Sequence, residues 1–232
     1  MKLFFKLLVF LSFFIFNNLN FLYANEFKET YDVEVGSIYV GELLWRVRIT
    51  GNKYKITINL QDRGILSGLY NFEGNYEASG FIIHNILIPK KYKQIWLAKK
   101  NKRSVEIFFD NGELINLELS PKEKESSRVQ YLGIRDYIDP LSSFLNILLG
   151  KKESKTIDGR RIYSMVINEH STNIDKEIKR ISIENYINLW ADHKRNDLKY
   201  IEIIQELEGV GVKMPSVVKI KFKSFVFKLT KI

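Results

Sequence analysis

The sequence predicts an all-β, mainly antiparallel protein: a curved sheet or incomplete β-barrel with one short apolar helix, plus a cleaved N-terminal signal helix. Two observations predict the sheet. Apolar and polar residues alternate with period two over most of the chain, and an Asn-Gly pair joins two such runs at 111–112. One apolar segment, 141–149, departs from the alternation and predicts the helix. With 45% hydrophobic and 13% aromatic residues, the chain can bury a core.

The first 24 residues have the three regions of a secretory signal peptide. Lys2 and Lys6 supply a positive start, residues 7–16 are apolar apart from one serine, and Ala24 is the small residue required before the cleavage site. The apolar run is shorter than the roughly 20 residues that a membrane-spanning helix needs. We therefore expect cleavage, with an uncleaved N-terminal membrane anchor as the alternative.

This gives a domain organisation of a signal peptide at 1–24 and a single β-rich periplasmic domain at 25–232. The 232 residues suit one domain, and no internal repeat or linker divides them. The chain has no cysteine, which is compatible with an oxidising compartment because nothing can mispair there. No later segment approaches membrane-spanning length, so we expect a soluble, exported, periplasmic protein.

Taken in chain order, the strands follow the alternation. Apolar residues recur at every second position in 31–35 and 54–58, and again in 105–109, which Asn111-Gly112 connects to the apolar run 114–119. Both central residues of a type I′ turn need positive φ, so Asn-Gly between two such runs predicts a β-hairpin. Asp158-Gly159 is a second hairpin candidate.

The helix follows a polar loop at 120–128. Asp139 is a favourable N-cap, Pro140 suits the first helical position, and Gly150 is placed to terminate the helix. Polar residues interrupt its apolar surface at only three positions, Ser142, Ser143 and Asn146. Such a helix is either buried on nearly all sides or covers something apolar.

The C-terminal strand carries a change of parity. Apolar residues occupy the even positions from Val218 to Phe222 and the odd positions from Phe225 to Leu229. A shift of one residue turns every side chain to the other face of a sheet. The sequence therefore predicts one long strand with a β-bulge near Lys223-Ser224.

No catalytic, cofactor or metal motif is recognisable. The three histidines (His84, His170 and His193) are far apart in sequence, and Ser142 is better explained by helix capping than as a nucleophile. Gly209-Val210-Gly211 lacks the third glycine of a phosphate-binding loop. We therefore predict no catalytic residue, no metal and no cofactor, and we lean towards a protein that is not an enzyme.

The basic residues admit two interpretations. Lysines and an arginine surround Trp96, and Lys219, Lys221 and Lys223 form a stripe. They either bind an anionic envelope component such as phospholipid or lipopolysaccharide, or they solvate the outer faces and edges of strands. The second interpretation is favoured, and nucleic acid is not an expected partner of an exported protein.

The order of several motifs resembles the domain of unknown function 3108 family, exported envelope proteins of Gram-negative bacteria. These motifs are Tyr31-Asp32-Val33-Glu34-Val35-Gly36 with Val40-Gly41, Ala78-Ser79-Gly80 with Pro89 and Tyr92, Asp139-Pro140-Leu141-Ser142, Asp158-Gly159-Arg160-Arg161 with Tyr163, and Pro215. Many members carry a cysteine pair around the Asp-Gly-Arg-Arg segment, which this chain lacks. The resemblance implies a curved antiparallel sheet similar to periplasmic lipoprotein carriers, and it implies no activity or catalytic residue.

Three functional hypotheses follow. In the first, the protein binds or transports a hydrophobic or amphipathic envelope component without catalysis, inside the apolar lumen of its curved sheet. The helix then closes that lumen, with candidate ligand-binding residues Leu141, Phe144, Leu145 and Leu148; alternatively the helix only completes the core. The second hypothesis is an envelope hydrolase with dispersed carboxylates. The third is a structural or assembly module that adds a partner strand at its sheet edge.

Overall fold

The computed structural model describes residues 25–64, 72–99, 101–190, 197–207 and 213–232. The predicted signal peptide at 1–24 lies outside the described residues. The strands and the helix have these bounds: β1 Asn25–Val35, β2 Ile38–Thr50, β3 Lys53–Asp62, β4 Phe72–Ile83, β5 Ile86–Ala98, β6 Asn101–Asp110, β7 Glu113–Ser120, α3 Pro140–Leu148, β8 Glu153–Ile157, β9 Arg161–Thr172, β10 Lys176–Asn188, β11 Leu198–Glu206, β12 Val217–Phe222 and β13 Val226–Lys231.

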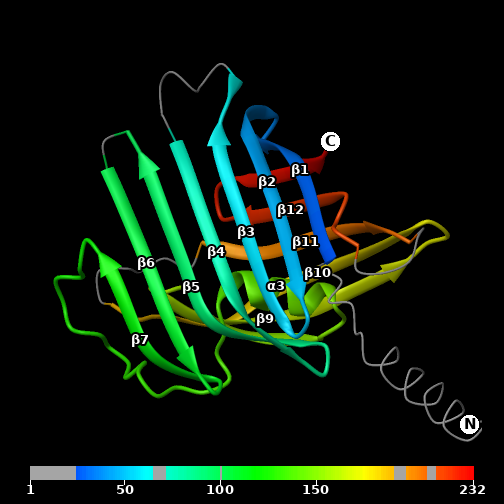
Figure 1. Ribbon diagram of the computed structural model, residues 1–232. Helices are drawn as coiled ribbons and strands as arrows, with labels where there is room; N and C mark the ends of the chain where they lie inside the picture. Colours follow the sequence, from blue (N-terminus) through cyan, green and yellow to red (C-terminus); the bar gives the residue numbers. More distant parts are fainter. Residues whose placement is uncertain (1–24, 65–71, 100, 191–196, 208–212) are drawn as a thin grey trace, which may run out of the picture.

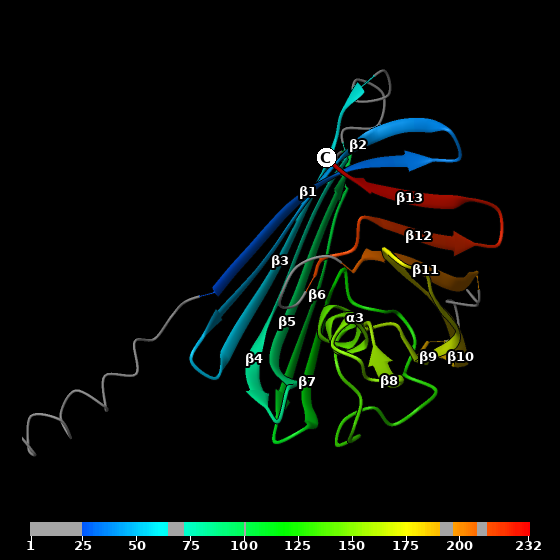
Figure 2. The same cartoon turned by 90° about the vertical axis from the view of Figure 1, so that its right-hand side faces the viewer.

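All thirteen strands belong to one antiparallel sheet, in the order β7-β6-β5-β4-β3-β2-β1-β13-β12-β11-β10-β9-β8 (Figure 1). Nearly every neighbour in the sheet is also a neighbour in sequence; the exception is β1 beside β13, which joins the two ends of the chain. The sheet bends so that β1–β7 faces β8–β13, with α3 between the two halves (Figure 2). The predicted curved, incompletely closed sheet is confirmed, with one short helix in the part of the chain that the structure describes.

Both predicted hairpin turns are present. Asn111 and Gly112 have φ values of 47° and 77°, as a type I′ turn requires, and they connect β6 to β7. Asp158 and Gly159 lie in the turn between β8 and β9. No helix among the described residues is long and apolar enough to cross a membrane.

The predicted β-bulge near Lys223-Ser224 is wrong. The chain reverses there: β12 ends at Phe222, β13 begins at Val226, and the Phe222 N–H donates to the Phe225 carbonyl at 2.9 Å. In such a tight turn the residues on either side of the loop face the same side of the sheet. A hairpin therefore changes the apolar parity just as a bulge would, and the parity alone cannot separate the two.

The two edge strands, β7 and β8, are bridged by the connection between them. The Leu114 N–H donates to the Ile134 carbonyl at 3.0 Å, and the Ile157 N–H donates to the Ile138 carbonyl at 2.9 Å. The connection thus spans the gap between the two edge strands beside the Asn111-Gly112 turn. Towards the end of β7, around Leu117 and Leu119, no backbone hydrogen bond joins the connection to either edge strand within the described residues. We call this gap the seam.

Candidate functional site

The helix begins at a buried carboxylate. One carboxylate oxygen of Asp139 accepts hydrogen bonds from the backbone N–H groups of Leu141 and Ser142, at 2.9 and 3.0 Å. The other oxygen is buried without a hydrogen-bond partner among the described residues. Burial raises the pKa of Asp139 from 3.8 to about 6, although the hydrogen bonds at the helix start act to lower it.

The three polar residues of the helix fix it to both halves of the sheet. Ser142 Oγ lies 2.7 Å from the Tyr54 hydroxyl on β3. The Asn146 amide accepts from the Leu87 N–H at 2.8 Å and donates to the Leu87 carbonyl at 3.2 Å, so it pairs with β5 much as a neighbouring strand would. Ser143 Oγ accepts from Thr156 Oγ1 at 2.8 Å, on β8.

The four predicted ligand-binding residues lie in different surroundings. Leu141, Leu145 and Leu148 are 9%, 3% and 8% exposed. Phe144 is partly buried, and its ring centroid lies 5.5 Å from that of Trp45. Their ligand-binding role stays a prediction.

Leu145 does line a small apolar gap at the C-terminal end of the helix. An apolar slot of about 20 Å³ is enclosed by Phe27, Val47, Ile49, Tyr54, Ile82, Leu87, Leu145, Leu149 and Met214. Two hollows of about 490 and 210 Å³ adjoin it: the first shares Leu149 with the slot, and the second shares Phe27 and Met214. We call the slot and its two hollows the lumen mouth.

Ionisable and amide side chains lie in the larger hollow beside this apolar slot, and they include a second glutamate, Glu206. Glu177, Gln205 and Lys213 line the larger hollow. Lys179 is buried behind them, and its ammonium lies 2.9 Å from the Glu177 carboxylate and 3.3 Å from the Gln205 side-chain oxygen. Partial burial acts to raise the pKa of Glu177, but hydrogen bonds from Lys179 and His170 outweigh it and hold that pKa below its usual value.

Sequence reasoning missed Lys179 and Gln205. Lys179 shares the strand parity of Ile181 and points with it to the inner face of β10. A lysine at an apolar parity position is the feature that could have identified it. Gln205 likewise shares its inward parity with Ile203 on the neighbouring strand. Only the pairing of β10 with β11 brings the two side chains together.

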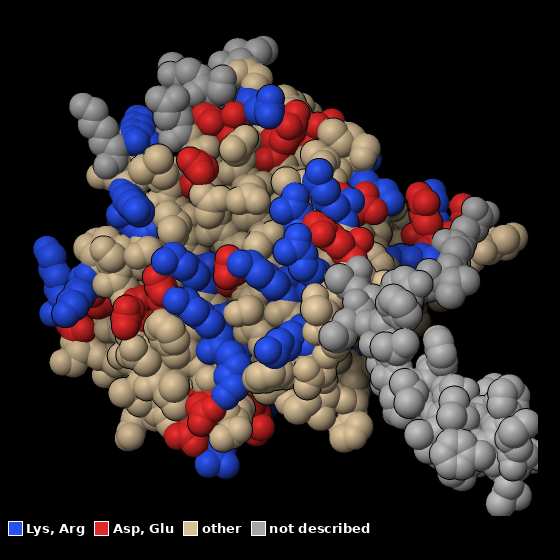
Figure 3. All heavy atoms as spheres, in the orientation of Figure 1, with Lys and Arg blue, Asp and Glu red and all other residues tan. Residues whose placement is uncertain are grey.

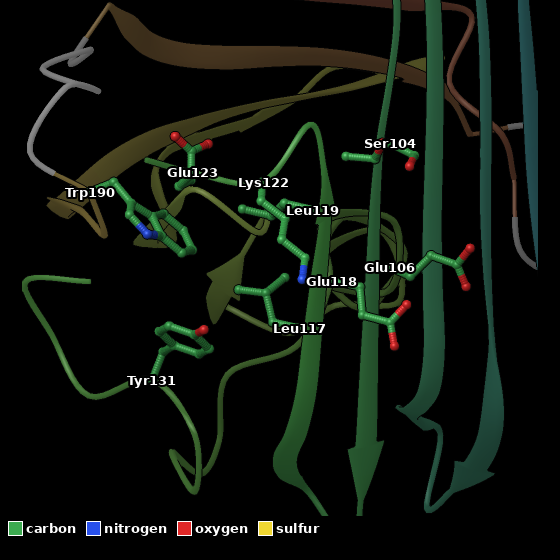
Figure 4. A pocket seen from close by; sticks show the side chains of 10 residues that line it. Ser104, Glu106, Leu117, Glu118, Leu119, Lys122, Glu123, Tyr131 and Trp190 are labelled. Carbon is green, nitrogen blue, oxygen red and sulfur yellow. The ribbon is translucent and has the colours of Figure 1, made fainter. Parts of the chain in front are cut away.

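The seam holds a second pocket, of about 600 Å³ (Figure 4). Tyr131 and Trp190 face it with ring centroids 5.6 Å apart, together with Leu117 and Leu119 from β7. Its most buried carboxylate, that of Glu123, forms an ion pair with Arg160. Ser104, Glu106 and Glu118 also line this pocket, but their side chains lie on the opposite side of β7 from the two rings (Figure 4). This pocket is therefore divided by the edge strand.

The Asp-Gly-Arg-Arg motif forms a structural turn beside the seam. The Asp158 carboxylate accepts hydrogen bonds from the Arg160 and Arg161 N–H groups and from Arg161 Nε, at 2.8 to 3.0 Å. Gly159 has a φ of +90°, and a Cβ atom added to it would lie 2.4 Å from a methyl group of Val105. The glycine is needed both for the turn and for this close approach.

The structure brings no metal site together among the residues it describes. His84 lies in the turn between β4 and β5, His170 pairs with Glu177 at 2.7 Å, and His193 lies outside the described residues. Within the described ranges, no three histidine, aspartate or glutamate side chains converge on a point that could hold a metal ion.

Comparison with known proteins supports the fold. Neither a protein-family model nor a curated protein matches the sequence, so the resemblance to the domain of unknown function 3108 family is not confirmed. Among solved structures, the chain is similar to a β-barrel-like protein of domain of unknown function 1849 from Brucella abortus, with a TM-score of 0.53 and 11% identity. The similarity covers 91% of this chain and 96% of that one, and at this identity it shows the fold alone.

Proposed function

We propose that the protein is an exported, periplasmic, non-enzymatic binding protein for an amphipathic envelope component, which it holds at the lumen mouth. The observation that carries the proposal is the apolar slot, bordered by Leu145 and Leu149, beside a polar hollow that shares Leu149 with it and is lined by Glu177, Gln205, Glu206 and Lys213. The seam pocket fits this role less well because β7 divides it and its most buried carboxylate is already paired.

The apolar side chains that line the slot, which we call the wall, favour an apolar group at one end of the ligand. Phe27, Ile49, Leu149 and Met214 come from different elements and enclose a space with room for one small group. An acyl or isoprenoid chain lying along the adjoining hollows would place its terminal carbon atoms there. Transfer of each CH₂ group from water to this wall contributes about 0.8 kcal/mol.

The polar side chains of the larger hollow, which we call the rim, favour a polar head group at the other end of the ligand. Lys179 faces inward, and two of the three N–H donors of its ammonium are accounted for by Glu177 and Gln205. Lys213 lines the same hollow, and no salt bridge joins its side chain to another described residue. An anionic or strongly polar head group would complete the hydrogen bonding of both lysines.

The test compares wild-type mature protein with Leu149→Gln, which changes the wall, and Lys213→Gln, which changes the rim. The probe is a fluorescent fatty acid, with its methyl ester as the uncharged equivalent. We expect Leu149→Gln to weaken the binding of both probes. Lys213→Gln should weaken the binding of the fatty acid only. Leu132→Gln is the matched control, because Leu132 is an exposed leucine that lines neither hollow nor slot.

Failure of wild-type protein to bind either probe would contradict the proposal. An equal loss of probe affinity in the Leu132→Gln and Leu149→Gln variants would contradict it too. Native mass spectrometry of protein purified from the periplasm then identifies a co-purifying ligand by mass. The same preparation tests export: N-terminal sequencing is expected to read from Asn25, and a membrane-bound species that begins at Met1 would contradict it.

A further inference from the structure

The inner face of the sheet continues as an apolar surface beyond the core, at the end of β1 opposite the lumen mouth. Cross-strand pairing places Ile38 opposite Val35, and Val35 opposite Phe227. Phe222 and Phe225 extend this surface, and they flank the turn between β12 and β13. We call these five residues the aromatic tip. Figure 2 shows its two hairpin turns, β1–β2 and β12–β13, side by side at the right of the view.

The three phenylalanines form one cluster at the margin of the core: Phe227 packs partly against the core, Phe222 is half-buried and Phe225 is exposed. The ring centroid of Phe222 lies 5.0 Å from that of Phe225 and 5.8 Å from that of Phe227. Phe225 is 39% exposed and Ile38 is 60% exposed, whereas Leu229, two residues further along β13 than Phe227, is buried. An aromatic cluster with exposed edges at a hairpin turn is a surface that another apolar phase can cover.

Basic side chains lie around the same hairpin, although Lys221 alternates with Ile220 and Phe222 and so points to the opposite face of β12. Lys221 and Lys223 sit at the end of β12 and in its turn, and Lys199 lies on the adjoining strand β11, where the pairing register shifts. None of the three forms a salt bridge with a described residue. On β1, which lies beyond β13, the Glu34 carboxylate is paired with Lys228 at 3.1 Å.

The outer surface of β2–β6 has a different arrangement. Over β2–β6 the basic and acidic side chains are interleaved (Figure 3), and many form cross-strand pairs such as Lys55 with Glu77 at 2.9 Å. Lys91 and Lys93 both pair with Glu106. Those lysines cover the outer faces of the strands, which is the interpretation that the sequence favours for the basic residues. The lysines at the aromatic tip remain available to an external anion.

We propose that the aromatic tip docks on an anionic membrane surface, with its phenylalanines entering the interface and Lys221 and Lys223 contacting lipid phosphates. Aromatic and aliphatic side chains flanked by lysines are the combination that binds at the boundary between head groups and acyl chains. The net charge of +9 for the whole chain, which becomes +7 when Lys2 and Lys6 are removed with the predicted signal peptide (9 − 2 = 7), acts in the same direction at long range. The inference is independent of the lumen mouth, because it concerns the opposite end of β1.

The experiment is co-sedimentation of full-length mature protein with vesicles of phosphatidylcholine, with and without phosphatidylglycerol. Wild-type protein is expected to bind only the phosphatidylglycerol vesicles, and less at high salt. The double variant Lys221→Gln, Lys223→Gln should lose roughly 30-fold in partition coefficient, from about 1 kcal/mol for each lysine near the surface. Phe225→Ser should lose roughly 10-fold or more.

Matched controls carry the same chemical changes elsewhere. Lys28→Gln with Lys53→Gln removes two exposed lysines that form no salt bridge with described residues, and Ile174→Ser removes a fully exposed apolar side chain in the β9–β10 turn. Both controls should bind like wild type. The proposal is overturned if wild-type protein does not bind the phosphatidylglycerol vesicles. It is also overturned if the control variants lose as much vesicle binding as the tip variants while all of them retain the wild-type melting temperature.

Discussion

The buried carboxyl of Asp139 makes a sharp prediction about pH. Its folded-state pKa is raised from 3.8 to about 6 because the side chain is fully buried at the start of α3. A carboxyl whose pKa is higher in the folded state binds its proton more tightly there. Its favourable contribution is therefore complete below pH 3.8 and is lost as the pH rises through 6. A shift of roughly 2 pH units corresponds to about 3 kcal/mol.

Asp139→Asn isolates this effect. Asparagine is as good an N-cap as aspartate and can still accept the two backbone hydrogen bonds, but it carries no charge. Relative to wild type, the Asp139→Asn variant should gain about 3 kcal/mol in free energy of unfolding between about pH 3.5 and about pH 7.5. Urea unfolding at several pH values measures this. Comparing the two proteins cancels the opposite pH dependence of Glu106, Glu177 and Glu202, whose pKa values are lowered.

Asp139→Ala supplies the control, because it removes the helix cap at every pH. At pH values where the wild-type carboxyl is protonated, it should lower the free energy of unfolding by about 1 kcal/mol. A stability difference between wild-type protein and the Asp139→Asn variant that stays constant with pH would refute the reasoning. It would mean that the hydrogen bonds at the helix start, and not burial, decide the ionisation of this carboxyl.

Three further sets of variants test how the helix and the seam are held. Leu148→Ala should lower the free energy of unfolding of ligand-free protein by about 2–5 kcal/mol, and Phe144→Ala should lower it by less because Phe144 is less buried. If the helix instead covers a ligand, both variants should change probe binding more than they change urea unfolding. Asn146→Ala leaves a backbone N–H and a carbonyl of β5 unpaired and should cost roughly 2–4 kcal/mol by urea unfolding, whereas a loss under about 0.5 kcal/mol would contradict the pairing. Gly159→Ala should reduce the melting temperature through strain and a clash with Val105, and Val105→Ala in the same chain should recover part of the loss.

The local elements of this protein follow from its sequence alone. Period-two alternation, the Asn111-Gly112 turn and the Asp139-Pro140 helix start each depend on residues close together in the chain, so all three were predictable. The same locality explains the failure near Lys223. A bulge and a hairpin produce the same change of parity, and only pairing with other strands distinguishes them.

Long-range pairing sets where these elements meet. The pairing of β1 with β13 joins residues about 200 positions apart, and no local pattern encodes such a partner. The contact of Lys179 with Gln205, the lumen mouth and the aromatic tip all result from strand pairings of this kind. Short-range sequence patterns specify which face of a strand is apolar, whereas the free energy of packing the two halves around α3 specifies which apolar faces remain open to a ligand or a membrane.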